Sequence, residues 1–278
     1  MTDPLPIILL TDFGTSDTYV GQVKAVLTAR APGASLIDLT HEVSPYAIDE
    51  GAWLLETALP FLPAPAVVLA VVDPGVGSER LPIAVRASAP GDPGSVRYFV
   101  GPDNGLLSAA APPDSRPSAP RSCPAPPGLD ICSIENPEAR LASVSATFHG
   151  RDLFAPAAAH IAVTGHHEAL GPARDELTLL PPFAGRTEGT TIRGTVIHVD
   201  RYGNLVTTIR KEQLPPDFTL DINAHTIERM VRTFSDASPG ALACHVDSSG
   251  FLAIAEREGN AAARTGAARG DAVVLTPR

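Results

Sequence analysis

An acidic residue and an arginine lie seven residues apart on one predicted loop. Asp73 directly follows the apolar run 66–72, which has the near-continuous hydrophobicity of a buried parallel strand. A proline and two glycines end that strand, and Arg80 follows them. Ligands of open α/β sheets bind beyond the carboxyl ends of the strands, so Asp73 and Arg80 are placed for chemistry. Taken alone, the loop fits equally well a plain turn in which Asp73 caps a backbone amide and Arg80 is solvated.

His149 is a second candidate for chemistry. Gly150 follows it, which allows a ligand to approach the backbone closely, and a predicted helix begins just beyond. This context favours a functional histidine over a structural one. His166 and His167 follow a glycine in a loop and are interpreted as solvated surface.

Two acidic residues, Asp12 and Asp17, follow the first apolar segment, 7–10. One acid is enough to cap the helix predicted next. We therefore expect the other to face a ligand, such as ribose hydroxyls or an ammonium group.

Two further loops lie between predicted β segments. The composition of 200–204 is typical of a hairpin turn, although Tyr202 and Asn204 also offer a purine a stacking face and an amide. The sequence alone favours the turn. Ser248 and Ser249, followed by a glycine, likewise indicate a hairpin.

Composition narrows the function classes. The formal net charge of −10 and the absence of any basic cluster argue against nucleic acid or an anionic membrane as the main partner. No apolar run among the first residues is long enough for a signal peptide or a membrane span, so we expect a cytoplasmic protein. The three cysteines form no disulfide framework or zinc motif. The sequence lacks the motifs of zinc proteases, EF-hands, dinucleotide-binding loops, nucleotide-phosphate loops and nucleophile elbows. We expect no metal or organic cofactor.

The order of elements predicts an α/β fold with two domains. The first half alternates strands and helices, as in a mainly parallel sheet. Its strands are predicted at 7–10, 35–40, 66–72, 82–86 and 96–100, and its helices at 19–30, 49–62 and 152–163. Residues 111–130 are rich in proline and lack periodicity, which predicts a solvated insertion.

The character of the chain changes near 181–185. Short alternating segments follow, separated by turn signals, as in an antiparallel barrel. These segments are 191–199, 205–210, 218–222, 226–233, 241–246, 251–255 and 272–275. The predicted domains are therefore an α/β body, 1–184, and a smaller all-β domain, 185–278.

Five motifs in this order resemble one family. They are LTDFGTSDTYVG at 10–21, VDPGVGSER at 72–80, GPDNGL at 101–106, TFHGRD at 147–152 and DRYGN at 200–204. The chain resembles the S-adenosyl-L-methionine (SAM) hydroxide adenosyltransferases, or SAM hydrolases, relatives of the fluorinases and chlorinases. The resemblance runs nearly end to end, apart from the 111–130 insertion.

The resemblance implies an N-terminal α/β domain, a C-terminal β-barrel and a homotrimer whose ligand lies between neighbouring subunits. It implies hydrolysis of SAM to adenosine and L-methionine, with no cofactor. The family's Asp, Arg and His triad corresponds to Asp73, Arg80 and His149. Halogenating relatives lack that triad, so its presence favours hydroxide over halide.

Substrate roles follow from the same resemblance. Asp12 would hold the ribose hydroxyls, Asp17 would lie near the methionine part, and Tyr46 would lie beside the sugar. Asp200, Tyr202 and Asn204 would line the methionine and adenine region from the neighbouring subunit. Ser248 and Ser249 would lie nearby, and the resemblance assigns no role to Glu256 or Arg257.

The residue types suit attack by water on C5′ of the ribose. Arg80 cannot lose its proton and would act as a fixed positive charge, Asp73 would orient the water or Arg80, and His149 could accept or relay a proton. Three alternatives stay open: a halogenase, a metal-dependent hydrolase with Asp12, Asp73 and His149 as ligands, and a non-catalytic adenosine- or SAM-binding protein.

Overall fold

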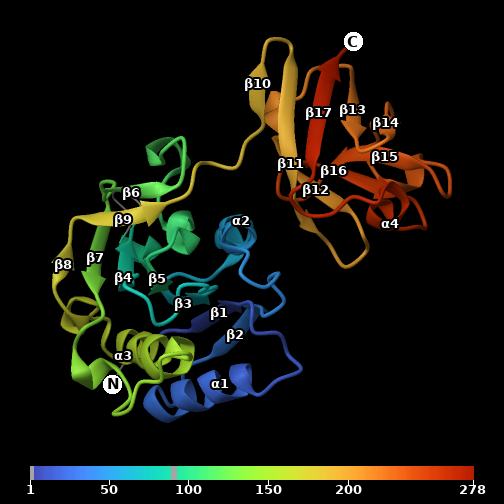
Figure 1. Ribbon diagram of the computed structural model, residues 1–278. Coiled ribbons are helices and arrows are strands. Elements are labelled where there is room, and N and C mark those ends of the chain that lie inside the picture. Colours follow the sequence, from blue (N-terminus) through green and yellow to red (C-terminus); the bar gives the residue numbers. More distant parts are fainter. Residues whose placement is uncertain (1–2, 89–92) are drawn as a thin grey trace. The chain divides into compact units, whose positions relative to one another are not determined.

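The computed structural model describes residues 3–88 and 93–278, which form two compact units, Met1–Pro182 and Phe183–Arg278 (Figure 1). The division lies close to the boundary that the sequence analysis proposes. Each unit has its own core. Within the described ranges, no helix is long and apolar enough to cross a membrane.

The N-terminal unit contains a seven-stranded mixed sheet in the order β2-β1-β3-β5-β4-β7-β8. The first four strands of that order are parallel to one another, as expected, and β4, β7 and β8 join them by antiparallel pairing. The strands are β1 (Ile7–Thr11), β2 (Leu36–Thr40), β3 (Ala66–Val71), β4 (Pro82–Ala87), β5 (Arg97–Pro102), β7 (Leu129–Ser133) and β8 (Ala173–Arg174). The fold class is thus the predicted α/β class, with a mixed rather than purely parallel sheet.

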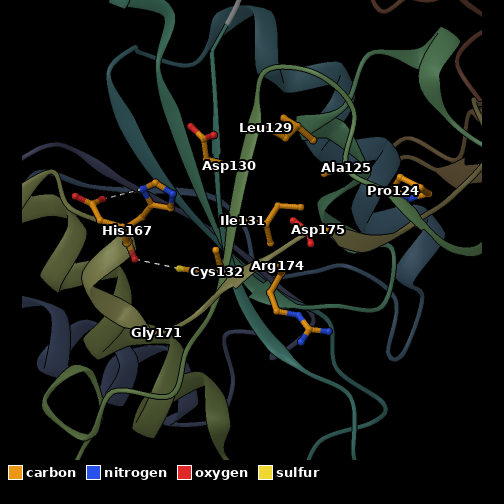
Figure 2. A pocket seen from close by; sticks show the side chains of 12 residues that line it. Pro124, Ala125, Leu129, Asp130, Ile131, Cys132, His167, Gly171, Arg174 and Asp175 are labelled. Carbon is orange, nitrogen blue, oxygen red and sulfur yellow. Dashed lines mark hydrogen bonds and ion pairs between the residues drawn. The ribbon is translucent and has the colours of Figure 1, made fainter.

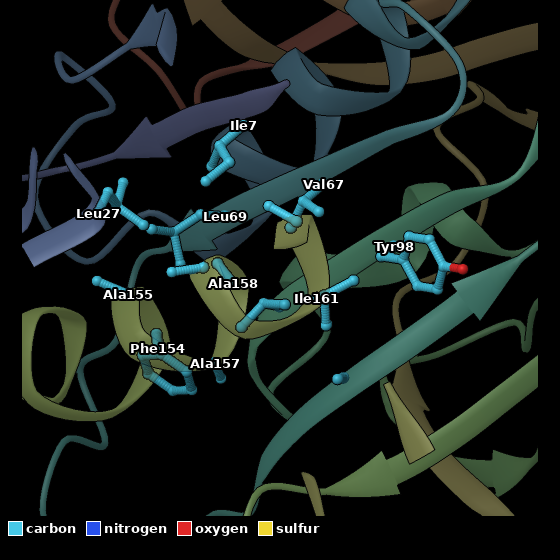
Figure 3. Close-up of a cluster of buried hydrophobic side chains, with 14 of the residues drawn as sticks. Ile7, Leu27, Val67, Leu69, Tyr98, Phe154, Ala155, Ala157, Ala158 and Ile161 are labelled. Atoms are coloured by element: carbon cyan, nitrogen blue, oxygen red, sulfur yellow. The ribbon is translucent and has the colours of Figure 1, made fainter. Parts of the chain in front are cut away.

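Helices cover both faces of this sheet. Along β1, Ile7 and Leu9 pack with α1 (Tyr19–Arg30) and α3 (Ala155–Thr164), while Ile8 and Leu10 pack with α2 (Ile48–Ala58). Figure 3 shows the first of these cores, with Ile7, Val67 and Leu69 of the sheet beside the small side chains of α3. Burial on both faces explains why the parallel strands are continuously apolar.

The helix predicted at 152–163 begins differently in the structure. A single π-helical turn, η6 (Gly150–Phe154), directly follows His149 and leads into α3. Gly165, at φ +73°, ends α3 in the left-handed conformation common after helices. π-Turns of this kind are frequent at functional sites.

The prediction that 111–130 is a solvated loop is wrong in part. Residues 121–124 form β6 (Arg121–Pro124), which pairs with β9 (Glu176–Leu179). Arg116 is buried and forms an ion pair with Glu56 at 2.6 Å. The pairing is long-range and β6 lacks apolar alternation, so no local signal revealed it.

The C-terminal unit is an antiparallel, barrel-like sheet, as predicted. Its main path is β14-β13-β17-β11-β12-β16-β15, with β10 paired to β11. The strands are β10 (Arg186–Glu188), β11 (Thr191–Val199), β12 (Leu205–Arg210), β13 (Phe218–Ile222), β14 (His225–Ile227), β15 (Leu242–Val246), β16 (Phe251–Glu256) and β17 (Ala272–Pro277). A bridge between Met230 and Cys244 nearly closes the barrel, and the short helix α4 (Ala261–Thr265) packs on β16.

Candidate active site

The sheet brings two acidic residues to the same edge. Thr11 of β1 and Val71 of β3 are paired in the parallel register, so Asp12 and Asp73 leave neighbouring strands at their carboxyl ends. A pocket of about 600 Å³ opens there. Its lining consists of Asp12, Phe13, Tyr19, Gln22, Pro45, Tyr46, Val71, Asp73, Val76, Ser145, Thr147, Phe148, His149, Gly150 and Arg151.

The predicted triad converges beside this pocket. Arg80 Nε donates to both carboxylate oxygens of Asp73, at 2.9 and 3.1 Å, and its Nη2 also contacts Oδ2. The same Nη2 lies 2.8 Å from Nδ1 of His149. Arg80 is not among the described residues that line the pocket: it lies behind Asp73 and His149, with its guanidinium carbon 5.2 Å from the centre of the Phe154 ring.

A glycine makes this convergence possible. Gly77 has φ +77°, and a Cβ at that position would lie 2.6 Å from the carbonyl oxygen of Ala146. The 73–80 loop can therefore approach the 145–149 segment closely only because residue 77 has no side chain. This contact joins two segments that are far apart in the sequence and carry Arg80 and His149.

The contact between Arg80 and His149 defines the tautomer of the imidazole. A guanidinium donates hydrogen bonds and accepts none, so Nδ1 of His149 is the acceptor and the ring hydrogen is on Nε2. Burial, followed by the positive charge of Arg80, holds the pKa of His149 below its ordinary value of 6.5. The geometry and the pKa direction agree on a neutral imidazole at pH 7.

Asp12 is held by the backbone of Tyr46. The Tyr46 amide donates to Oδ2 of Asp12 at 2.9 Å. Burial raises the pKa of the Asp12 carboxyl, and the nearby charge of Asp73 adds to that effect. Tyr46 has φ +68° and is 72% exposed, a strained backbone conformation at the rim of the pocket.

Asp17 lies apart from this pocket. Within the part of the chain that the structure describes, it lines a more open hollow together with Lys24, Asp38 and His41. His41 is buried and joins Asp38 to Thr11, the residue before Asp12, through hydrogen bonds of 3.1 and 2.8 Å. The predicted contact of Asp17 with the methionine part of the substrate stays a prediction.

The predicted residues of the C-terminal unit form turns. Asp200 accepts hydrogen bonds from the backbone amides of Tyr202 and Asn204, both at 2.9 Å, and from the Asn204 side chain at 2.8 Å. These bonds close the hairpin between β11 and β12 and leave Tyr202 77% exposed. Ser248 and Ser249 lie in the β15–β16 hairpin, where Asp247 accepts from the Ser249 amide. Whether these side chains bind substrate stays a prediction.

Sequence reasoning assigned no role to an aromatic cluster that lines the pocket. Phe148 packs edge to face on Phe13 and on Tyr19, these two rings are tilted against each other, and the ring centres lie 5.1 to 6.2 Å apart. Arg151 stacks on Phe148 and lines the same pocket. All four lie inside the quoted motifs, but only the folded chain shows that they share one wall.

A larger hollow of about 720 Å³ lies elsewhere in the N-terminal unit, beside β7 and β8 (Figure 2). There Cys132 donates to the carbonyl of His167 at 3.0 Å, and His167 pairs with Glu168 at 3.2 Å. Burial raises the pKa of the Cys132 thiol to about 11, so this cysteine is a poor nucleophile. None of the predicted site residues lines this hollow.

The described acidic, histidine and cysteine side chains do not gather into a metal-binding group. Among residues 3–88 and 93–278, no group of three or more His, Cys, Asp or Glu side chains is arranged to hold a metal ion. Asp73 and His149 instead direct their polar atoms toward Arg80.

The fold and the site together define a two-domain protein with an Asp–Arg–His cluster at the carboxyl edge of its α/β sheet. Family models name the group: the SAM hydroxide adenosyltransferase N-terminal domain matches residues 7–171, and the C-terminal domain of the same family matches 194–274. The chain therefore belongs to the SAM hydroxide adenosyltransferase family.

Individual relatives agree with this assignment. A Thermus thermophilus protein named (R)-S-adenosyl-L-methionine hydrolase is 39% identical, over 97% of this chain and 99% of its own length. A Salinispora tropica protein of the same name is 40% identical over 98% of each chain. A fluorinase of an Actinoplanes species is 24% identical over 90% of each. The solved structure of a conserved protein from Thermotoga maritima has a TM-score of 0.82 and 32% identity, covering 97% of this chain and 99% of that one.

Proposed function

We propose that this protein hydrolyses SAM to adenosine and L-methionine by attack of water on C5′ of the ribose. The convergence of Asp73, Arg80 and His149 beside one pocket is the observation that carries the proposal. Membership of the family and the hydrolase names of the relatives at 39–40% identity support it. Relatives named fluorinase are more distant, which favours water over halide as nucleophile.

In the proposed reaction one bond forms and one breaks at C5′. The water oxygen attacks C5′, and the C5′–S bond breaks with its electron pair going to sulfur. The sulfonium becomes the neutral thioether of methionine, and the water proton is lost, giving adenosine. Positive charge on sulfur disappears along this path, so a pocket that excludes bulk water assists it.

The hydrogen bonds assign distinct tasks to the three side chains. Nδ1 of His149 accepts from Arg80 and is not free to take the water proton, so His149 offers Nε2–H to orient the water. Both oxygens of Asp73 accept from Arg80, but Oδ1 accepts a single one of these bonds and keeps a second lone pair, so the carboxylate of this lining residue is the group left to receive that proton. Arg80 holds both partners in place and favours hydroxide character in the attacking water through its charge.

Substrate contacts complete the proposal. Asp12 would bind the ribose hydroxyls through Oδ1, because its other oxygen accepts from Tyr46. Asp17 and the ring of Tyr46 would contact the methionine and the sugar. In a homotrimer, Asp200, Tyr202, Asn204, Ser248 and Ser249 would reach the substrate from a neighbouring subunit. Cys123, Cys132 and Cys244 are free thiols, as is typical of a reducing compartment, so a cytoplasmic location fits the proposal.

Incubation with SAM in ¹⁸O-labelled water tests the reaction directly. We expect methionine and adenosine in equal amounts by mass spectrometry, with one ¹⁸O atom in adenosine and none in methionine. A 5′-halogenated nucleoside formed in proportion to added chloride or fluoride would instead identify a halogenase. Tight SAM binding with no methionine release over hours would identify a binding protein, and activity lost on chelation would identify a metal-dependent enzyme.

A further inference from the structure

Arg151 is the cation among the charged side chains that line the pocket. The lining residues of the Asp, Glu, His, Lys and Arg types are Asp12, Asp73, His149 and Arg151. Because His149 is neutral and Arg80 lies behind the wall, Arg151 is the one permanent positive charge among the described lining residues. An anionic group of a ligand in this pocket would therefore find its complement at Arg151.

The guanidinium of Arg151 is held rigidly in place. Its Nε and Nη2 donate to the two oxygens of Asp152, at 2.6 and 3.0 Å, and its Nη1 donates to Oε1 of Gln22 at 2.8 Å. Asp152 is itself buried and accepts from the Ser145 amide at 2.8 Å. The guanidinium carbon lies 4.8 Å from the centre of the Phe148 ring. Such a prearranged group loses little entropy when it binds a ligand.

The hydrogen bonds leave part of Arg151 free. A guanidinium has five N–H donors, and three are used by Asp152 and Gln22. One N–H remains on each terminal nitrogen, with no further acceptor among the described residues. The side chain is 32% exposed, so a ligand can reach these two donors. Guanidinium N–H donors of this kind form charge-assisted hydrogen bonds with a carboxylate.

We propose that Arg151 binds the carboxylate of the methionine part of SAM and so determines specificity for the complete amino acid. The inference rests on the proposed function. SAM carries a sulfonium, an ammonium and one carboxylate. Among the charged side chains of the lining, the carboxylate has Arg151 as its counterpart.

Comparison of SAM with its decarboxylated analogue tests the proposal. For the wild type we expect kcat/KM to be about 10- to 100-fold higher for SAM, as one charged hydrogen-bonded pair provides. Arg151→Gln should raise KM for SAM by a similar factor, change kcat little, and leave KM for the analogue unchanged. Arg151→Lys should recover part of the preference, since it keeps the charge and loses the paired donors.

Arg86→Gln is a matched control. Arg86 has the same exposure, 33%, and forms an ion pair with Asp130 at 2.9 Å, but does not line this pocket. The Arg86→Gln variant should retain the wild-type preference for SAM over the analogue. Thermal melts of all variants report whether they fold.

Three outcomes would overturn the role of Arg151. One is an active wild type whose kcat/KM values for SAM and the analogue differ by less than about threefold. This result needs no variant. Another is an unchanged SAM-to-analogue ratio in folded Arg151→Gln. The third is an equal loss of the preference in Arg86→Gln. A wild type that releases no methionine from SAM would instead defeat the proposed function, before any variant is compared.

Discussion

The two units of the chain differ in net charge and in the sequence separation of their polar contacts. The C-terminal unit has eleven basic and eleven acidic residues, so the whole formal charge of −10 lies in residues 1–182. In the N-terminal unit, Arg80 joins Asp73 of its own loop to His149, which lies 69 residues further along the chain. In the C-terminal unit, Asp200 is bound by amides two and four residues away. Long-range polar contacts build a site, whereas local ones build a turn.

The largest effect is expected at Arg80. Arg80→Gln should lower kcat about 10²- to 10³-fold, because it removes the charge that supports the nucleophile and the group that joins Asp73 to His149. SAM affinity should change little, since Arg80 lies behind the pocket wall. Methionine release at saturating SAM measures kcat, and titration calorimetry measures binding.

Arg116→Gln is the control for Arg80, since Arg116 is buried in an ion pair with Glu56 away from the pocket. Both variants remove the arginine of an ion pair and should lose stability, by up to about 3–5 kcal/mol. Only Arg80→Gln should lose activity beyond its folded fraction. Equal specific activities of the two folded variants would remove Arg80 from the mechanism.

The second prediction concerns pH. The pKa of His149 lies below 6.5 because of burial and the charge of Arg80, so kcat/KM should be level above pH 6.5 and fall about tenfold per pH unit below the pKa. Unfolded His149 binds its proton at a higher pH than folded His149. The stability that this group contributes is therefore present above pH 6.5 and is lost as the pH falls through the folded pKa. A pH–rate profile that already declines from pH 8 to 7 would contradict the neutral imidazole.

The third prediction compares two turns of the C-terminal unit. Asp200 and Asp247 each accept two backbone amides at a hairpin, and Asp200 also accepts from a side chain. Asp200→Ala and Asp247→Ala should each lower the free energy of unfolding by about 1–3 kcal/mol, as denaturant titration measures. If Asp200 also contacts substrate in the trimer, Asp200→Ala should raise KM for SAM, whereas Asp247→Ala should do so only through the proposed contacts of Ser248 and Ser249. A wild-type KM in Asp200→Ala would leave Asp200 a turn residue.

The smallest effect is expected at two strained positions. Tyr46 at the pocket rim has φ +68°, and Asn223 in the C-terminal unit has φ +48°. Glycine at either position relieves backbone strain but adds freedom to the unfolded chain, so the free energy of unfolding should change by about 1 kcal/mol or less. Tyr46→Gly should also raise KM for SAM, while Asn223→Gly and Tyr46→Phe should not. A KM unchanged in Tyr46→Gly would argue against a contact between its ring and the sugar.

Much of the fold was predictable because its signals are local. The continuous apolar runs of β1 and β3, and the turn residues around Asp200, indicate their structures within a few neighbours. The 111–130 segment was not predictable in this way, because β6 is defined by pairing with β9, some fifty residues further on. The π-turn after His149 likewise depends on packing rather than on propensity.

The candidate site likewise has features that the sequence predicts and features that only the structure shows. Residue types and motif order identified Asp73, Arg80 and His149 as candidates, and the structure brings them together. Nothing in the sequence indicated that Arg80 lies behind the pocket or that Arg151 lines it. The direction of the Arg80 hydrogen bond also changes the expected task of His149, from accepting a proton to orienting the water.

Hydrophobic periodicity, turn residues and five ordered motifs were enough to specify two domains, their strand-end loops and the family, because each signal is carried by residues close together in the chain. The tertiary structure decided which side chains meet. The β1–β3 register places Asp12 beside Asp73, and the close approach of Gly77 to Ala146 brings Arg80 to His149, 69 residues further along the chain. Such contacts are products of packing between segments, so local sequence cannot encode their geometry.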